Sequence, residues 1–170
     1  MKVRWQTNVV LMITIAAAMT VAAQSPKEDP TTPRQTQARG YWTDPSTGLM
    51  WAGKDNGKDV SWKGAVKYCR DLRLAGYSDW RLANMPELQS IYDKTANAPG
   101  LAGMHDDPTM WHVKGNLFLT GHPWANDENR SSSGHHYYFE FIQGEFNDQP
   151  SGFLYSSSFM RALCVRGSGK

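Results

Sequence analysis

The sequence has few cysteines, no excess of one charge after the first few residues and only one long apolar run. Two cysteines among 170 residues are too few for a disulfide-dense scaffold. No long run of lysine and arginine is present, which gives little support to nucleic-acid binding. The one uncharged apolar run covers Val9 to Val21, and no second run follows that predicts a membrane segment.

That apolar run has the features of a secretory signal peptide over residues 1–23. Lys2 and Arg4 precede it, and Val21 and Ala23 put small residues at the −3 and −1 positions of a cleavage site. A bilayer-spanning helix needs roughly 20 apolar residues, so the run is short for an anchor, although an uncleaved anchor remains the alternative. We therefore expect a protein that is secreted, or located in the periplasm or on the exterior of the cell envelope.

Removal of the signal changes the charge balance. Lys2 and Arg4 leave with it, so 16 basic and 16 acidic residues remain and the mature chain is formally neutral. A neutral chain of this length predicts one domain with a real core, no nucleic-acid partner and no membrane insertion after cleavage. An oligomer is possible, but the chain has neither a collagen-like repeat nor a coiled coil to impose one.

The mature chain divides into a tether and a domain. Residues 24–39 contain three prolines and no aromatic residue, a composition typical of a flexible linker. Aromatic residues become frequent from Gly40 onwards, which predicts a domain over residues 40–167 and a short tail over residues 168–170.

In the first half of the domain, turn and cap residues predict two strands and two helices. Strands are expected at Tyr41–Trp42 and at Leu49–Trp51, on either side of a turn. Ser61 is a suitable N-cap for a helix from Trp62 to about Leu74, and Asn84 begins a capping box for a second helix.

The second half is predicted to contain long loops and then strands. Loops are expected at Lys94–Asn116 and Pro123–Gly134, and strands at His136–Ile142 and Phe159–Arg166. The fold class is therefore α+β, with two early helices and strands at both ends. Four tryptophans are expected in the core: Trp42, Trp51, Trp62 and Trp80.

Cys69 and Cys164 both lie in the mature part. In an exported protein two cysteines are most simply explained by one disulfide, and Cys69 falls on the apolar side of the predicted helix. The bridge would close a loop of 95 residues, for which the chain-entropy relation gives roughly 4–5 kcal/mol. Two free thiols or a metal-binding pair are the alternatives.

Five short motifs occur in a fixed order along the domain. They are Asp44-Pro45-x-Thr47-Gly48-Leu49-Met50-Trp51, Trp62-x-x-Ala65-x-x-Tyr68-Cys69, Ala75-Gly76-Tyr77-Ser78-Asp79-Trp80-Arg81-Leu82, Glu87-Leu88 and Arg161-x-x-Cys164-Val165-Arg166. Together they resemble the Lcl C-terminal domain family, a bacterial domain of unknown function named for the end of a collagen-like surface adhesin. The resemblance covers about residues 41 to 167. It is weak between Lys94 and His136, where ligand-facing loops are expected, and Ala83 stands where the family usually has proline.

The resemblance implies a C-type-lectin-like fold, with two early helices packed on a small, mostly antiparallel sheet and long irregular loops. In such domains a cysteine of the first helix bonds to one of the last strand, and Cys69 and Cys164 occupy those positions. It also implies an adhesin-type binding role and, in some members, oligomers.

Cofactors are not expected. Many C-type lectins hold sugar through calcium with a Glu-Pro-Asn or Gln-Pro-Asp motif, whereas Gln149-Pro150-Ser151 lacks the third oxygen ligand. If calcium binds at all, the candidate ligands are Asp127, Glu128, Asn147 and Asp148. The histidines form no His-Glu-x-x-His motif, so no zinc site is predicted.

An enzyme is not expected either. The chain has no Gly-x-Ser-x-Gly motif. A related fold is used by formylglycine-generating enzymes, but their active site needs free cysteines, which a disulfide would remove.

A binding role remains, through the loops in about residues 100–152. Aromatic side chains stack on sugar rings while amides and charged groups bond the hydroxyls. The predicted ligand-binding residues are Trp111, Trp124, Asn126, Asn129, Arg130, Tyr137 and Tyr138. The partner is expected to be a glycan or an extracellular protein surface. The alternatives are core packing for Trp124 and, for the whole domain, a structural or protein–protein interaction module without sugar binding.

Overall fold

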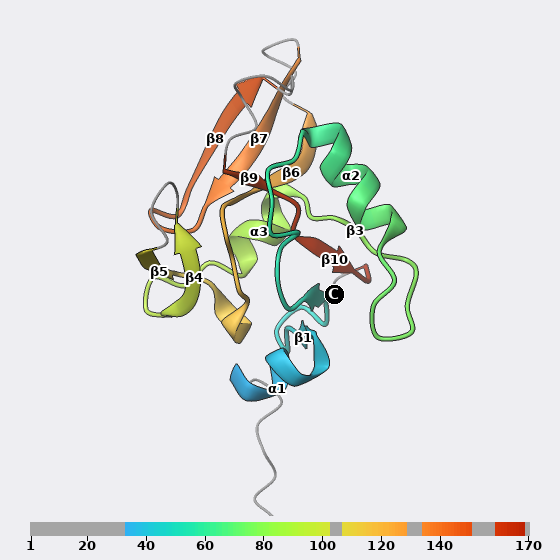
Figure 1. Ribbon diagram of the computed structural model, residues 1–170, viewed down its shortest axis with the longest axis vertical. Coiled ribbons are helices and arrows are strands. Elements are labelled where there is room, and N and C mark those ends of the chain that lie inside the picture. The colour runs from blue at the N-terminus through green and yellow to red at the C-terminus, as the bar shows by residue number, and fades with distance from the viewer. Residues whose placement is uncertain (1–32, 103–106, 129–133, 151–158, 169–170) are drawn as a thin grey trace, which may run out of the picture.

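A computed structural model describes residues 33–102, 107–128, 134–150 and 159–168 (Figure 1). Its helices are α1 (Pro33–Arg39), α2 (Trp62–Asp71), α3 (Met85–Ser90) and the 3₁₀ helix η1 (Lys114–Asn116). Its strands are β1 (Tyr41–Thr43), β2 (Met50–Ala52), β3 (Arg81–Leu82), β4 (Ala98–Ala102), β5 (Asp107–Trp111), β6 (His122–Glu128), β7 (His135–Glu140), β8 (Glu145–Pro150), β9 (Met160–Arg161) and β10 (Cys164–Arg166). The domain is α+β, as the sequence predicts.

Two four-stranded sheets form the frame. One has the strand order β1-β2-β10-β3 and is antiparallel throughout, and the other has the order β8-β7-β6-β9, in which only β9 is parallel to its neighbour. The chain from Met160 to Arg166 supplies β9 to one sheet and β10 to the other, so it ties them together (Figure 1). The hairpin of β4 and β5 lies at one side.

Both predicted helix caps are present. The Ser61 hydroxyl accepts a hydrogen bond from the Gly64 amide at 3.2 Å and begins α2. At α3, the Asn84 side chain accepts from the Glu87 amide at 2.9 Å and the Glu87 carboxylate accepts from the Asn84 amide at 2.9 Å. These bonds satisfy amide groups that a helix leaves unpaired at its start.

The predicted disulfide joins α2 to β10. Cys69 and Cys164 are both completely buried, with Cα atoms 5.3 Å apart. Because the chain has two cysteines and both are bonded, no free thiol remains. Such a bridge is consistent with an extracytoplasmic location. Within the described ranges no helix is long and apolar enough to cross a membrane.

The core consists of two clusters of buried side chains. One surrounds α3 and contains Trp42, Trp51 and Leu88, and the other lies beneath α2 and contains the disulfide and Trp80. Three of the four tryptophans expected in the core are therefore confirmed. Trp62 is only half-buried: it stacks on the His136 ring, with ring centroids 3.7 Å apart.

The predicted tether, 24–39, is wrong at its end, because Pro33–Arg39 forms α1. Thr36 is 2 % exposed, and its hydroxyl donates to the Gly115 carbonyl at 2.9 Å. Arginine, glutamine and alanine are good helix formers and proline suits a first turn, so local propensity and this tertiary contact both favour α1. Residues 1–32, which include the predicted signal peptide, lie outside the described part of the chain.

Two predicted loops are also wrong. Lys94–Asn116 contains the β4–β5 hairpin and η1, and Pro123–Gly134 contains most of β6, a strand in the interior of its sheet. Asn126, Asp127 and Glu128 have low strand propensity by themselves. Pairing with β7 and burial of Trp124 and Ala125 outweigh that propensity.

Candidate functional site

The sheet of β6, β7 and β8 has one face against α3 and another face on the side of α2. On the α3 side, Phe139 and Phe146 pack with their rings 4.7 Å apart against the core. Side chains alternate between the faces of a strand, so the neighbouring positions point the other way. Tyr138 is paired with Trp124 on one side and with Asn147 on the other. We call this second surface the α2-side face and define it by six half-buried residues: His122, His136, Tyr138, Glu140, Asn147 and Gln149.

Aromatic rings meet around His122 on this face. The His122 ring lies 5.7 Å from Trp111 and 5.7 Å from Tyr138, and Tyr138 meets Trp124 edge-on at 6.4 Å. The structure thus brings three of the predicted ligand-binding residues together. His122 was not among the predicted ligand-binding residues. It lies two positions before Trp124, so a strand prediction for this segment would have put both side chains on the same face.

Trp111 and Trp124, however, are core residues. They are 1 % and 0 % exposed, and the Trp124 indole N–H donates to the Val60 carbonyl at 2.8 Å. A ring this deeply buried has no face left for a ligand to stack on. The structure therefore favours the core alternative for Trp124, and it exposes neither indole to direct ligand contact.

At neutral pH the α2-side face presents uncharged rings beside a carboxylate. Burial lowers the pKa of His122, although the Glu140 charge opposes the shift, and the Arg161 charge lowers it further. Burial also raises the pKa of Tyr138, helped by the charges of Glu140 and Asp148. The imidazole and the phenol are therefore neutral hydrogen-bonding groups at pH 7.

Two polar atoms on this face are buried without a hydrogen-bond partner among the described residues. They are Nδ1 of His122 and Nε2 of Gln149. An unpaired buried polar atom costs free energy, and few are tolerated in a folded protein. Gln149 is paired with His136, whereas His122 lies toward the Glu140 end of β7, so the two atoms mark the two ends of the face. At each end a water or a ligand can complete the bonding.

The other predicted ligand-binding residues are separated. Tyr137 points to the α3 side, where it packs against the core, and Asn126 is exposed on β6. Asn129 and Arg130 lie outside the described residues.

The calcium candidates do not converge. The Asp127 carboxylate accepts from the Met85 amide at 2.6 Å, and the Asp148 carboxylate bonds the His135 ring at 2.8 Å. Asn147 is half-buried on β8, and the side chain of Glu128 is not described. In the described part of the chain no three histidine, cysteine or acidic side chains are grouped so as to hold a metal ion.

The motifs that carry the family resemblance are engaged in structural contacts. Arg166 bonds both oxygens of Asp79, at 2.8 and 3.0 Å, and its guanidinium lies 3.6 Å from the centre of the Tyr77 ring. Arg81 forms a two-bond pair with Glu87 at 2.5 and 2.7 Å. Together these contacts join β10, α3 and the loop before β3.

A second polar network holds the loop before α2. Asp55 is 2 % exposed, and its carboxylate accepts from the amide of Thr120 at 2.5 Å and from its hydroxyl at 2.9 Å. Arg161 donates to the same hydroxyl at 2.7 Å and pairs with Asp59. Burial raises the pKa of Asp55, against the hydrogen bonds from Thr120 and Gly57 that lower it. Every member has a partner, so this network has a structural role.

The surface is also hollowed near α1. An open groove of about 500 Å³ lies between the turn after β1, the segment before β4, and η1. Its lining includes Trp42, Asp93 and Lys114.

Comparison with protein families identifies the class of the domain. Residues 40–166 match the Lcl C-terminal domain, so the chain belongs to that family. The resemblance inferred from the five motifs is thereby confirmed. No curated protein matches the chain.

Proposed function

We propose that this protein is a secreted, lectin-like, non-enzymatic binding domain that recognises a glycan through the α2-side face. The observation that carries the proposal is the pair of buried, unpaired polar atoms, His122 Nδ1 and Gln149 Nε2, on a face that also offers a phenol and an amide. Family membership and the bridge between α2 and β10 support a C-type-lectin-like layout.

The chemistry of the face suits a polyhydroxylated ligand. A sugar hydroxyl both donates and accepts hydrogen bonds, so its site needs neutral donors and acceptors at fixed positions and a charged acceptor. The phenol of Tyr138 and the amide of Asn147 are neutral donors and acceptors, and the Glu140 carboxylate is a charged acceptor. The buried ring of Trp124 meets the Tyr138 ring edge-on and supports it.

A catalytic role is not proposed. Both cysteines are in the bridge, so the thiol chemistry of a formylglycine-generating enzyme has no thiol to use. A structural or protein-docking module is the competing function, and it is distinguished by indifference to sugars.

The test is a glycan panel titrated with the mature protein, with and without a chelator. We expect saturable binding that the chelator leaves unchanged, and an affinity at least tenfold weaker in the double variant Asn147→Ala, Gln149→Ala. Asn126→Ala, an exposed amide on the same sheet, is the matched control and is expected to bind as the parent does. A panel without binders would support the protein-docking module instead, and equal loss in the control would place the site elsewhere.

A further inference from the structure

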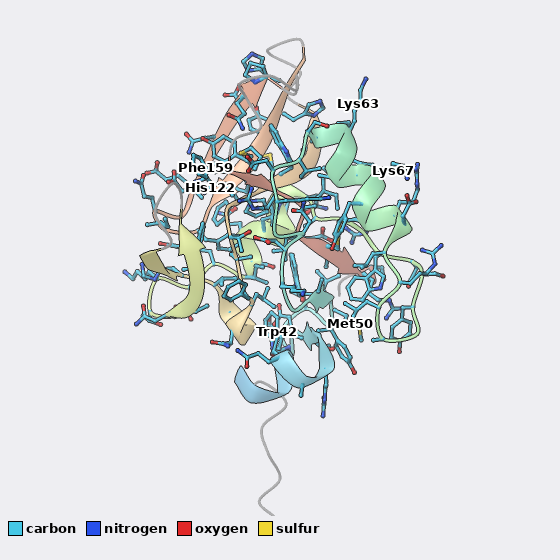
Figure 2. The ribbon with its side chains drawn as sticks, in the orientation of Figure 1. Trp42, Met50, Lys63, Lys67, His122 and Phe159 are labelled. Carbon is cyan, nitrogen blue, oxygen red and sulfur yellow. A yellow bond between two sulfur atoms is a disulfide. The ribbon has the colours of Figure 1, made fainter. Side chains whose placement is uncertain are left out.

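The groove near α1 is a candidate ligand site separate from the α2-side face. Three chain segments far apart in the sequence form it: residues 44–46 after β1, residues 93–98 before and into β4, and residues 113–116 at η1. Its volume of about 500 Å³ is in the range of small-molecule sites. Figure 2 shows Trp42, which lines the groove, close to α1 and well away from His122.

The walls of the groove are held in place by hydrogen bonds. The buried Asp44 carboxylate accepts from the Ser46 amide at 2.9 Å and from its hydroxyl at 2.7 Å. Asp93 accepts from the Thr95 amide at 2.9 Å in the same way. The Lys114 ammonium donates to the Ser90 carbonyl at 2.8 Å, which ties η1 to α3. These bonds fix the shape of the groove before any ligand arrives.

The floor of the groove holds a buried polar group without a partner. Trp42 is 3 % exposed, and its indole N–H has no hydrogen-bond partner among the described residues. A Cβ atom added to Gly115 would lie 2.2 Å from the Trp42 ring, so only glycine lets η1 pack against it. Ala98 and Val113, both buried, complete an apolar floor beside the indole.

The rim of the groove carries unused polar side chains. The amides of Asn97 and Asn116 form no hydrogen bond within the described part of the chain, and both line the groove. Asn116 has a φ of 53°, in the left-handed region that asparagine tolerates better than most residues. An apolar floor with amides at the rim matches a ring that has one apolar face and hydroxyls at its edge.

The charge of the groove favours a neutral ligand. Hydrogen bonds from Thr95 lower the pKa of Asp93, while at Asp44 burial is outweighed by bonds from Ser46 and Thr47. Two carboxylates therefore face one ammonium, that of Lys114. An anionic ligand would meet a net negative surface, whereas a neutral polyol bonds to both signs.

We propose that this groove binds a single ring of a neutral saccharide between Asn97 and Asn116, above the buried indole of Trp42. The inference rests on the proposed function for the class of ligand only, and it assigns that ligand to a second place on the domain.

The probes are the methyl glycosides of glucose, galactose and N-acetylglucosamine, titrated into the mature protein and followed by NMR of the backbone and indole N–H groups. The Trp42 indole signal is assigned through its contact with Gly115. We expect this signal to shift and saturate with at least one glycoside. The double variant Asn97→Ala, Asn116→Gly is expected to weaken that binding at least tenfold, since glycine keeps the left-handed backbone at residue 116.

Asn126→Ala, which removes an exposed amide outside the groove, is the matched control and is expected to change the affinity of the groove less than twofold. Thermal unfolding of each variant shows whether the fold is intact. Asp93→Asn is a second variant of the groove lining. The inference is overturned if the Trp42 signal stays fixed while signals of the α2-side face respond, a result that leaves the proposed function standing. Absence of any response to glycosides and to the glycan panel overturns both. A stronger response of the Trp42 signal to a sulfated polysaccharide than to the neutral glycosides overturns the class of ligand.

Discussion

The sheet that contains β10 and the sheet that contains β7 use their polar side chains differently. Around the first, Arg166 is paired with Asp79 and Arg81 with Glu87. On the α2-side face of the second, His122 and Gln149 keep buried polar atoms that no described residue satisfies. The charged residues of the family motifs thus stabilise the fold, whereas the α2-side face contains no residue of those motifs.

The physical basis of this difference is the cost of burial. A buried polar group that is bonded contributes about 1 kcal/mol, whereas an unbonded one costs about 1–3 kcal/mol. Each unbonded atom is therefore a point at which a bound water or a ligand gains free energy by completing the bonding. Stability measurements on substituted variants test whether the polar residues of the two sheets differ in this way.

Trp124→Ala is expected to cost about 3–5 kcal/mol of the free energy of unfolding. The side chain is completely buried, and its indole N–H bond to Val60 is lost as well. Urea denaturation of parent and variant measures the difference. A loss below 1 kcal/mol would mean that Trp124 is not part of the core and is open to ligand after all.

Replacing both cysteines, Cys69→Ala with Cys164→Ala, is expected to lower the free energy of unfolding by about 2–5 kcal/mol. The bridge closes a separation of 95 residues and joins α2 to β10. The same urea experiment measures it, with the parent under reducing conditions as the comparison. Unchanged stability would show that the two core clusters hold the sheets together without the bridge.

Asn84→Ala removes the cap of α3 and is expected to cost about 1 kcal/mol. The Glu87 amide loses its acceptor, and the second half of the capping box loses its geometry. Asn126→Ala, which removes an exposed amide, is the control and is expected to have little effect. Equal stability of the two variants would contradict the structural role assigned to the cap.

The stability of the domain is expected to fall as the pH drops below about 6.5, in part because of His122. Burial lowers the pKa of His122 in the folded state, so the unfolded chain binds the proton first and protonation favours unfolding. Above that pH both states are neutral and the contribution is constant. The slope of unfolding free energy against pH from 7 to 5 should be shallower in His122→Gln, and an identical slope would refute the assignment.

Asn147→Ala is expected to change the free energy of unfolding by less than about 0.5 kcal/mol, because its side chain makes no hydrogen bond among the described residues. The proposed function instead predicts an effect of this substitution on glycan binding. Thermal unfolding measures the stability, and a destabilisation as large as that of Asn84→Ala would place Asn147 among the fold-stabilising residues.

Short-range patterns in the sequence predicted the helix caps and the disulfide. Cap residues such as Ser61 and Asn84 act within one helical turn, so their pattern is visible in the sequence. The strand predicted over Phe159–Arg166 is present as two short strands, β9 and β10, which belong to different sheets. Leu163 and Val165 enter the cluster around α3, while Met160, Ala162 and Cys164 enter the cluster beneath α2.

Strand pairing was not visible in the same way. The polar run that contains Asn126 and Asp127 looks like a loop, yet it pairs with β7. Trp111 and Trp124 look like exposed loop aromatics, yet strands that meet from distant parts of the chain bury them. His122 and Gln149 are 27 positions apart in the sequence, and only the pairing of the strands brings them to one face of the sheet.

Residue type and short spacing are sufficient to predict the family, the α+β class, the two capped helices and the pair of cysteines. They do not predict which aromatic rings are core, which polar atoms stay unpaired and where the surface is hollowed. These properties depend on contacts between segments dozens of residues apart, and a local pattern carries no information about what a side chain meets across a sheet.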